Sequence, residues 1–162
     1  MKKLRLMVVD YDKANCELAE KFLSCEEIEV VAIAHDGVDC LAKLENTSVD
    51  IILTELMLPK MDGYLLMDCI NSSRMAVKPK IFIMSNILTE PYLTKKKEKG
   101  VTYYFFKPLE YSVMRKVILE KYNSQSIWQV MTKPDKHKQH GDGRTSETGY
   151  VLDERIARIF LS

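Results

Sequence analysis

One stretch decides the fold of this chain: residues 51–63, which read IILTELMLPKMDG. It passes from a short apolar and β-branched run to the acidic residue Glu55, and then to a loop that ends in Asp62 and Gly63. An apolar run that ends at a carboxylate is typical of a buried strand in a parallel sheet, where ligands collect at the carboxyl edge. We therefore expect Glu55 to lie at that edge and the rest of the chain to support it.

Length and composition indicate one domain with some additional chain. The 162 residues carry 24 basic and 23 acidic side chains, so the net charge of +1 gives no electrostatic reason to expect nucleic acid or a membrane surface. Residues 4–9 are too short an apolar run for a signal peptide, and nothing reaches the length of a membrane span. The cysteines have no metal-binding spacing, which favours reduced thiols and a cytoplasmic location. They are Cys16, Cys25, Cys40 and Cys69.

Strand and helix patterns alternate along residues 1–122. Apolar and β-branched runs predict strands over 4–9, 28–34, 49–54, 81–84 and 102–106. Helical spacing follows each strand, carried by Leu18 and Phe22, then by Val38, Leu41 and Leu44, then by Leu66, Cys69 and Ile70, by residues 89–99, and by Met114, Val117, Ile118 and Tyr122. Short connections between such elements predict an α/β fold with a doubly wound, five-stranded parallel sheet of (βα)5 order.

The C-terminal part of the sequence has a different character. Residues 123–149 are polar and weakly periodic, which predicts a flexible linker. Residues 150–162 recover helical spacing and predict a short helix that is too small to form its own core. The expected organisation is therefore one domain over 1–122, a linker over 123–149 and a short helix over 150–162.

Polar side chains follow four of the expected strands. Asp10 and Asp12 follow the first, Glu55 the third, Ser85 the fourth and Lys107 the fifth. The carboxyl ends of parallel strands lie side by side, so these groups should converge. Carboxylates hold hard cations such as Mg²⁺, while a hydroxyl and an ammonium stabilise an oxyanion, so the set is suited to a phosphoryl group. Any one of them alone could simply meet water at a strand end.

The same positions resemble the receiver domain of bacterial response regulators, which has a flavodoxin-like fold. The resemblance covers about residues 1–122 and is carried by Asp10, the run LPKMDG at 58–63, Ser85 and Lys107-Pro108. It implies that position 55 accepts a phosphoryl group from a histidine kinase and that two adjacent acids after the first strand bind Mg²⁺. It further implies that Ser85 and Lys107 bind phosphoryl oxygens, that Tyr104 reports the state, and that the Lys107-Pro108 bond is cis.

Two departures from this pattern predict that the usual phosphorylation is lost. Glu55 stands where the acceptor aspartate is expected, and Tyr11 stands where the second acid is expected and should fill that space with its ring. A misplacement of about 1 Å can reduce in-line transfer about 100-fold. Asp12 lies one residue too far along and Asn86 adds bulk at the mouth, so the Mg²⁺ site on Asp10 is expected to be weak or lost. Glu55 can instead pair with Lys107, which would hold the domain in one state, although simple decay of the site is an open alternative.

A narrower resemblance links the chain to the stage-zero sporulation regulators of endospore-forming Firmicutes. It rests on Val8-Val9-Asp10, on residues 36–41 (DGVDCL) and on Lys107-Pro108-Leu109. Residues 151–160 (VLDERIARIF) resemble the opening helix of that family's DNA-binding domain. The sequence ends before a helix-turn-helix, so we expect no direct DNA binding, as in a truncated paralogue or a fragment. The expected partners are a histidine kinase, a phosphotransferase, the intact regulator or a second copy of the chain.

Two alternatives to this pseudo-receiver interpretation remain. The first is a conventional, phosphorylatable receiver of a truncated transcription factor. The second is a Mg²⁺-dependent phosphatase that uses the DxD pattern of Asp10 and Asp12. The phosphatase is disfavoured because the run LPKMDG at 58–63 has no role in it, and we therefore expect no enzymatic activity.

Overall fold

The computed structural model describes residues 2–87 and 100–123, which form a parallel five-stranded sheet and four helices. The strands are β1 (Leu4–Val9), β2 (Ile28–Ala34), β3 (Ile51–Thr54), β4 (Lys80–Ser85) and β5 (Val101–Phe106), in the sheet order β2-β1-β3-β4-β5. The helices are α1 (Lys13–Leu23), α2 (Gly37–Leu44), α3 (Gly63–Ser72) and α5 (Tyr111–Asn123). The predicted doubly wound sheet is confirmed. The predicted helix over 89–99, the linker beyond Asn123 and the helix over 150–162 lie outside the described residues.

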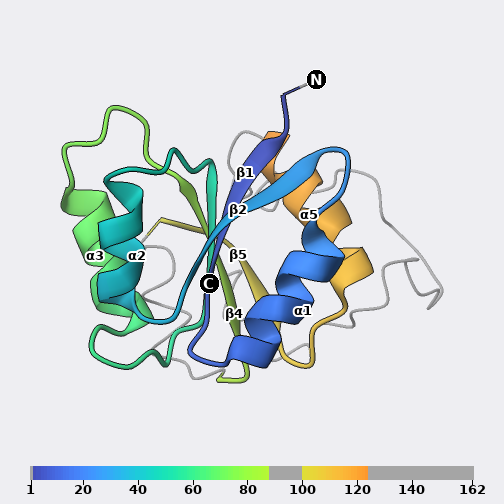
Figure 1. Ribbon diagram of the computed structural model, residues 1–162, viewed down its shortest axis with the longest axis horizontal. Coiled ribbons are helices and arrows are strands. Elements are labelled where there is room, and N and C mark those ends of the chain that lie inside the picture. The colour runs from blue at the N-terminus through green and yellow to red at the C-terminus, as the bar shows by residue number, and fades with distance from the viewer. Residues whose placement is uncertain (1, 88–99, 124–162) are drawn as a thin grey trace, which may run out of the picture. The chain divides into compact units, whose positions relative to one another are not determined.

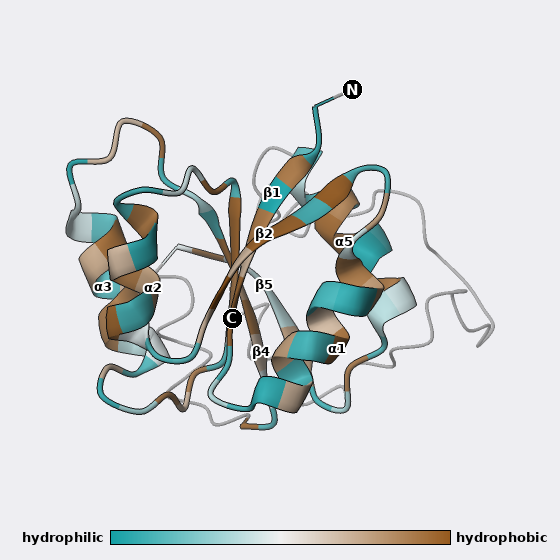
Figure 2. Cartoon of the chain, viewed as in Figure 1, coloured by the Kyte–Doolittle hydropathy of each residue, from teal (hydrophilic) through white to brown (hydrophobic). Residues whose placement is uncertain are grey.

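Helices α1 and α5 cover one face of the sheet, and α2 and α3 cover the other (Figure 1). The strands are mostly hydrophobic, while the helices carry hydrophilic residues between apolar ones (Figure 2). Strand β3 lies in the middle of the sheet, and all four of its residues are buried. This burial on both faces explains why residues 51–54 read as a continuous apolar run rather than an alternating one.

Each of the first three helices begins at an aspartate in the loop that follows a strand. Asp12, Asp36 and Asp62 accept hydrogen bonds from the backbone N–H groups of Ala14, Asp39 and Leu65, at 2.9, 2.8 and 2.8 Å. Such N-caps satisfy amides that have no partner within the helix and stabilise a helix by about 1 kcal/mol each. The caps therefore fix where the chain turns back from the carboxyl edge of the sheet.

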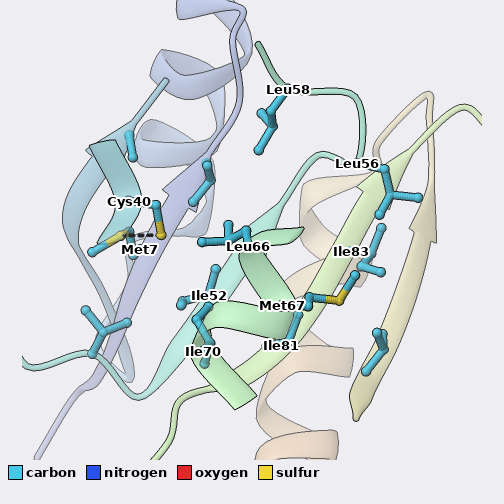
Figure 3. Close-up of a cluster of buried hydrophobic side chains, with 14 of the residues drawn as sticks. Met7, Cys40, Ile52, Leu56, Leu58, Leu66, Met67, Ile70, Ile81 and Ile83 are labelled. Carbon is cyan, nitrogen blue, oxygen red and sulfur yellow. Dashed lines mark hydrogen bonds between the residues drawn. The ribbon is translucent and has the colours of Figure 1, made fainter. Parts of the chain in front are cut away.

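The two helical layers enclose two apolar cores. One lies between the sheet and α2 and α3, where Ile52, Leu66 and Ile70 pack together and the Cys40 thiol lies 3.5 Å from the Met7 sulfur (Figure 3). The other lies under α1 and α5 and includes Phe82. Removing each such large side chain from water contributes about 2 kcal/mol. The sheet, whose carboxyl edge carries the polar side chains, is therefore stabilised by an apolar core on each face.

The helix predicted from the spacing of Leu18 and Phe22 is present, but its buried face is a different one. Leu18 and Phe22 are each 44% exposed, whereas Cys16, Ala19 and Leu23 face the sheet. The small side chains at 16 and 19 let the helix approach the strands closely, so the larger pair is left on its flank. Phe22 there stacks on Tyr111 of α5, with ring centroids 5.7 Å apart.

Smaller differences affect three other elements. Val38 is 49% exposed, and α2 buries Gly37 and Cys40 instead. In α3, Met67 is buried while Cys69 is only partly buried. Strand β3 begins at Ile51 rather than at residue 49. Within the described residues, no helix has the length and apolarity needed to span a membrane.

Candidate functional site

Three strands deliver charged side chains to one pocket at the carboxyl edge of the sheet. Asp10 follows β1, Glu55 follows β3 and Lys107 follows β5. The Lys107 Nζ lies 3.0 Å from Asp10 Oδ2 and 2.8 Å from Glu55 Oε2. Strands β1 and β3 are hydrogen-bonded neighbours with Val9 beside Thr54, which places the two acids next to each other. The predicted ion pair between Glu55 and Lys107 is present.

Asp10 is fully buried, and both of its carboxylate oxygens are engaged. Oδ1 accepts a hydrogen bond from the Asp12 backbone N–H at 2.9 Å, and Oδ2 accepts one from the Asn15 side-chain amide at 3.3 Å in addition to the contact with Lys107. Its carbonyl oxygen is held by the Cys16 thiol at 3.3 Å and lies 3.1 Å from the Nδ1 of His35. The Asp10 carbonyl is therefore contacted both by α1, through Cys16, and by the residue that follows β2, His35.

Glu55 is 3% exposed and turns back toward its own loop. Its Oε1 accepts hydrogen bonds from the backbone N–H groups of Leu56 at 2.7 Å and Met57 at 3.4 Å, while Oε2 faces Lys107. Two amides and an ammonium are the donors that an oxyanion requires. The longer arm of glutamate thus lets the carboxylate itself occupy this set of donors.

The charge on Lys107 is reinforced by the two acids. Burial favours the neutral amine and lowers the pKa of Lys107, but hydrogen bonds and charge attraction from Glu55 and Asp10 more than offset it, so the net pKa is raised. The same surroundings act on a neighbour: burial, and then the negative charge of Asp10, raise the pKa of the Cys16 thiol to about 11. Cys16 is therefore a protonated structural thiol at neutral pH.

Tyr11 and Asp12 do not occupy the pocket as expected. Tyr11 is 58% exposed, so its ring points largely to solvent and does not fill the space expected for a second acid. Asp12 uses its side chain to cap α1 through Ala14. Position 12 is the N-cap of α1, so its carboxylate is engaged by the helix rather than by the pocket.

Ser85 and Tyr104 belong to a hydrogen-bonded chain that ends at Lys107. Ser85 is fully buried, its Oγ accepts from the Ile87 backbone N–H at 3.4 Å, and its carbonyl accepts from the Lys107 N–H at 3.1 Å. The Tyr104 hydroxyl donates to the Ile87 carbonyl, and Tyr104 is buried. The Lys107-Pro108 bond is cis, as expected, while Asn86 is exposed. The aromatic position on β5 is therefore connected to the pocket through the end of β4.

The loop after β3 is fixed by contacts that the sequence pattern does not predict. The Gly63 N–H donates to the Leu56 carbonyl at 2.8 Å, and a Cβ at Gly63 would lie 2.7 Å from the carbonyl oxygen of Glu55. Lys60, which has a φ of 60°, forms an ion pair with Asp36 at 2.7 Å. The sequence feature that could have indicated these contacts is the pair of Asp-Gly turns at 36–37 and 62–63. This close packing holds the amides that bind Glu55.

Comparison with known proteins identifies the family. The model of the response regulator receiver domain matches residues 6–119, which is most of the chain. The chain belongs to the response regulator receiver domain family. Receiver domains of two-component systems communicate with kinases and other proteins, so protein partners are expected of this receiver too.

Solved structures agree with this assignment. The receiver is similar to a CheY-like receiver domain protein from Methanospirillum hungatei JF-1, with 25% identity over 75% of this chain and 95% of that chain, at a TM-score of 0.68. The receiver domain of a putative NarL from Mycobacterium tuberculosis matches at 20% identity over 77% and 100% of the two chains, with a TM-score of 0.70. The chemotaxis regulator CheY4 of Vibrio cholerae matches at 19% identity over 74% and 99%, with a TM-score of 0.66. The last two likenesses show the fold alone.

The pocket does not fit the Mg²⁺ ion that the family implies. Each carboxylate oxygen of Asp10 and Glu55 already accepts at least one hydrogen bond or ion pair. Tyr11 supplies no carboxylate, and Asp12 caps α1. Among residues 2–87 and 100–123, no three His, Cys, Asp or Glu side chains converge as metal ligands.

Proposed function

We propose that this chain is a receiver-type regulatory domain that is not phosphorylated by the usual route and acts through protein–protein contacts. The observation that carries this proposal is the position of the Glu55 carboxylate, which is bound by Lys107 and by the amides of Leu56 and Met57. A phosphoryl group on the acceptor side chain would require hydrogen-bond donors of this kind for its oxygens. The receiver then keeps one state, set by Glu55.

Phosphoryl transfer requires a carboxylate oxygen that can reach the donor in line. Glu55 Oε1 is held at 2.7 Å by the Leu56 amide, and Oε2 is held at 2.8 Å by Lys107. Attack by either oxygen would have to use its remaining lone pair while these contacts fix the position of the carboxylate in a buried pocket. A displacement of about 1 Å already reduces such reactions about 100-fold, so Glu55 is a poor acceptor and a good internal anion.

The biological setting that we infer is the control of transcription during sporulation. The support is the resemblance of residues 36–41 and 107–109 to the receivers of stage-zero sporulation regulators, and of residues 151–160 to the start of their effector domain. Such a chain would bind a histidine kinase, a phosphotransferase or the intact regulator. Binding of this chain to each of the three as a purified protein, measured by calorimetry, tests the assignment, and failure of all three contradicts it.

Acetyl phosphate with Mg²⁺ tests the chemistry directly. We expect intact mass and tryptic mapping to find no phosphate adduct on the wild-type chain. The double variant Tyr11→Asp, Glu55→Asp should gain an adduct at position 55, because it restores the shorter acceptor and the second acid. A stable, Mg²⁺-dependent adduct on Glu55 of the wild type overturns the proposal and favours the conventional receiver. A folded double variant that gains none would place the obstacle elsewhere, with Asn86 the first candidate.

A further inference from the structure

The position of Lys107 has a meaning beyond its pairing with Glu55. Its ammonium lies between two acids whose side chains are 0% and 4% exposed, at 3.0 Å from Asp10 and 2.8 Å from Glu55. Buried carboxylates require a compensating cation, because an uncompensated charge away from water is strongly unfavourable. The ammonium meets this requirement for both acids at once.

The remaining oxygens of the two acids are also satisfied by the protein. Asp10 Oδ1 accepts from the Asp12 amide at 2.9 Å, and Glu55 Oε1 accepts from the Leu56 amide at 2.7 Å. Mg²⁺ requires short contacts, at about 2.1 Å, with near-octahedral geometry. Each carboxylate oxygen has a second lone pair, so a divalent ion would have to share these oxygens with Lys107 and the loop amides and would lie next to the ammonium.

The charge balance of the pocket leads to the same conclusion. Asp10, Glu55 and Lys107 together leave one excess negative charge, which a divalent ion would convert into an excess positive charge beside a buried ammonium. A carboxylate in place of Tyr11 would remove that imbalance, but the tyrosine side chain carries none.

We propose that the Lys107 ammonium is the resident cation of this pocket and replaces the divalent ion that the receiver family implies. The pocket is then complete without metal, and its state does not respond to Mg²⁺. This inference concerns the pocket in the absence of any phosphodonor, so it stands or falls separately from the proposed lack of phosphorylation.

Titration of the 162-residue chain with MgCl₂ alone tests the proposal. We expect the backbone amide signals of Asp10, Asp12, Glu55 and Leu56 to show no saturable change up to about 10 mM Mg²⁺, well above the roughly 1 mM dissociation constants of the weakest Ca²⁺ sites in proteins. Saturable binding to the wild type anywhere in this range overturns the proposal.

Removing the resident cation should create the metal site. In Lys107→Ala, the same titration should become saturable and Mg²⁺ should raise the Tm, because a ligand that binds only the folded state stabilises it. Tyr11→Asp provides a second variant at an exposed position that should fold normally and gain weaker binding. The matched control, Lys60→Ala, removes an exposed lysine ion pair and should gain none. Absence of binding in folded Tyr11→Asp and in Lys107→Ala, or equal binding in the control, overturns the proposal.

Discussion

Two lysine–carboxylate ion pairs of nearly equal length have very different surroundings. The Lys107–Glu55 contact is 2.8 Å and the Lys60–Asp36 contact is 2.7 Å. The Lys107 side chain is 20% exposed, whereas that of Lys60 is 70% exposed. Water screens the Lys60–Asp36 pair and hydrates Lys60 when that pair opens. The acids around Lys107 are buried, so water solvates their charges poorly when the Lys107 contacts are lost. The length of an ion pair therefore does not indicate its contribution to stability.

The two pairs also differ in what they connect. Lys107 joins the end of β5 to the ends of β1 and β3 through Asp10 and Glu55. Lys60 joins the loop after β3 to Asp36, the residue that caps α2. The first holds strands that are distant in the sequence, and the second holds two adjacent turns. Substitutions in each pair can test this contrast.

The largest expected effect comes from removing Lys107. Lys107→Ala leaves Asp10 and Glu55 buried without a counter-ion, and it should lower the free energy of unfolding by about 3 kcal/mol, the low end of the range for breaking a buried pair because Lys107 keeps some exposure. Urea unfolding of the variant and wild type without Mg²⁺ measures this loss. A loss as small as that in Lys60→Ala would show that the two pairs are equivalent.

A second test separates the pairs by pH. The pKa of Lys107 is raised above its usual 10.5 in the folded state, so its contribution is complete below pH 10.5 and is lost as the pH rises through the folded pKa. The hydrogen bond from Lys60 lowers the pKa of Asp36 below its usual 3.8, so that contribution is complete above pH 3.8 and is lost as the pH falls through the folded pKa.

Unfolding measured from neutral pH to about pH 11 should therefore show the difference between wild type and Lys107→Ala shrinking only above pH 10.5. The difference between wild type and Lys60→Ala should shrink only at the acidic end, below pH 3.8. If the Lys107 difference shrinks between pH 7 and 9 instead, the ammonium is not stabilised by the two acids as described.

The smallest effect is expected at Lys60. Its ion pair is exposed, and its φ of 60° is unfavourable for any residue with a Cβ. Lys60→Ala should therefore be only slightly less stable than wild type, and Lys60→Gly should be more stable than Lys60→Ala, because both lose the ammonium but only glycine adopts this φ without strain. Thermal unfolding at low and high salt measures both variants. The reverse order would mean that the backbone at position 60 is not strained.

The sequence was sufficient to predict the sheet and the meeting of Asp10, Glu55 and Lys107. Parallel strands place their carboxyl ends at one edge, so strand assignment alone brings these residues together. The backbone contacts of Glu55 were not predictable in the same way. They depend on how far the side chain turns back toward Leu56, which is a choice among rotamers that no periodicity reveals.

The side that a helix or turn presents to the sheet was also not determined by the sequence pattern. The spacing of Leu18 and Phe22 fits a buried stripe, but Cys16, Ala19 and Leu23 fit a neighbouring stripe of the same helix equally well. Packing against the sheet selects the stripe with the smaller side chains. Tyr11 is similar, because residue type alone does not show whether a tyrosine after a strand enters the pocket or, as here, is exposed.

The contact between Lys107 and Asp10 joins positions 97 residues apart. Closing so long a segment of chain costs conformational entropy before any contact compensates for it, so interactions of this kind are expected to form late in folding. Stabilisation that is absent from the folding transition state slows unfolding without speeding folding. The charged pocket is therefore expected to lower the unfolding rate and so to lengthen the lifetime of the folded receiver.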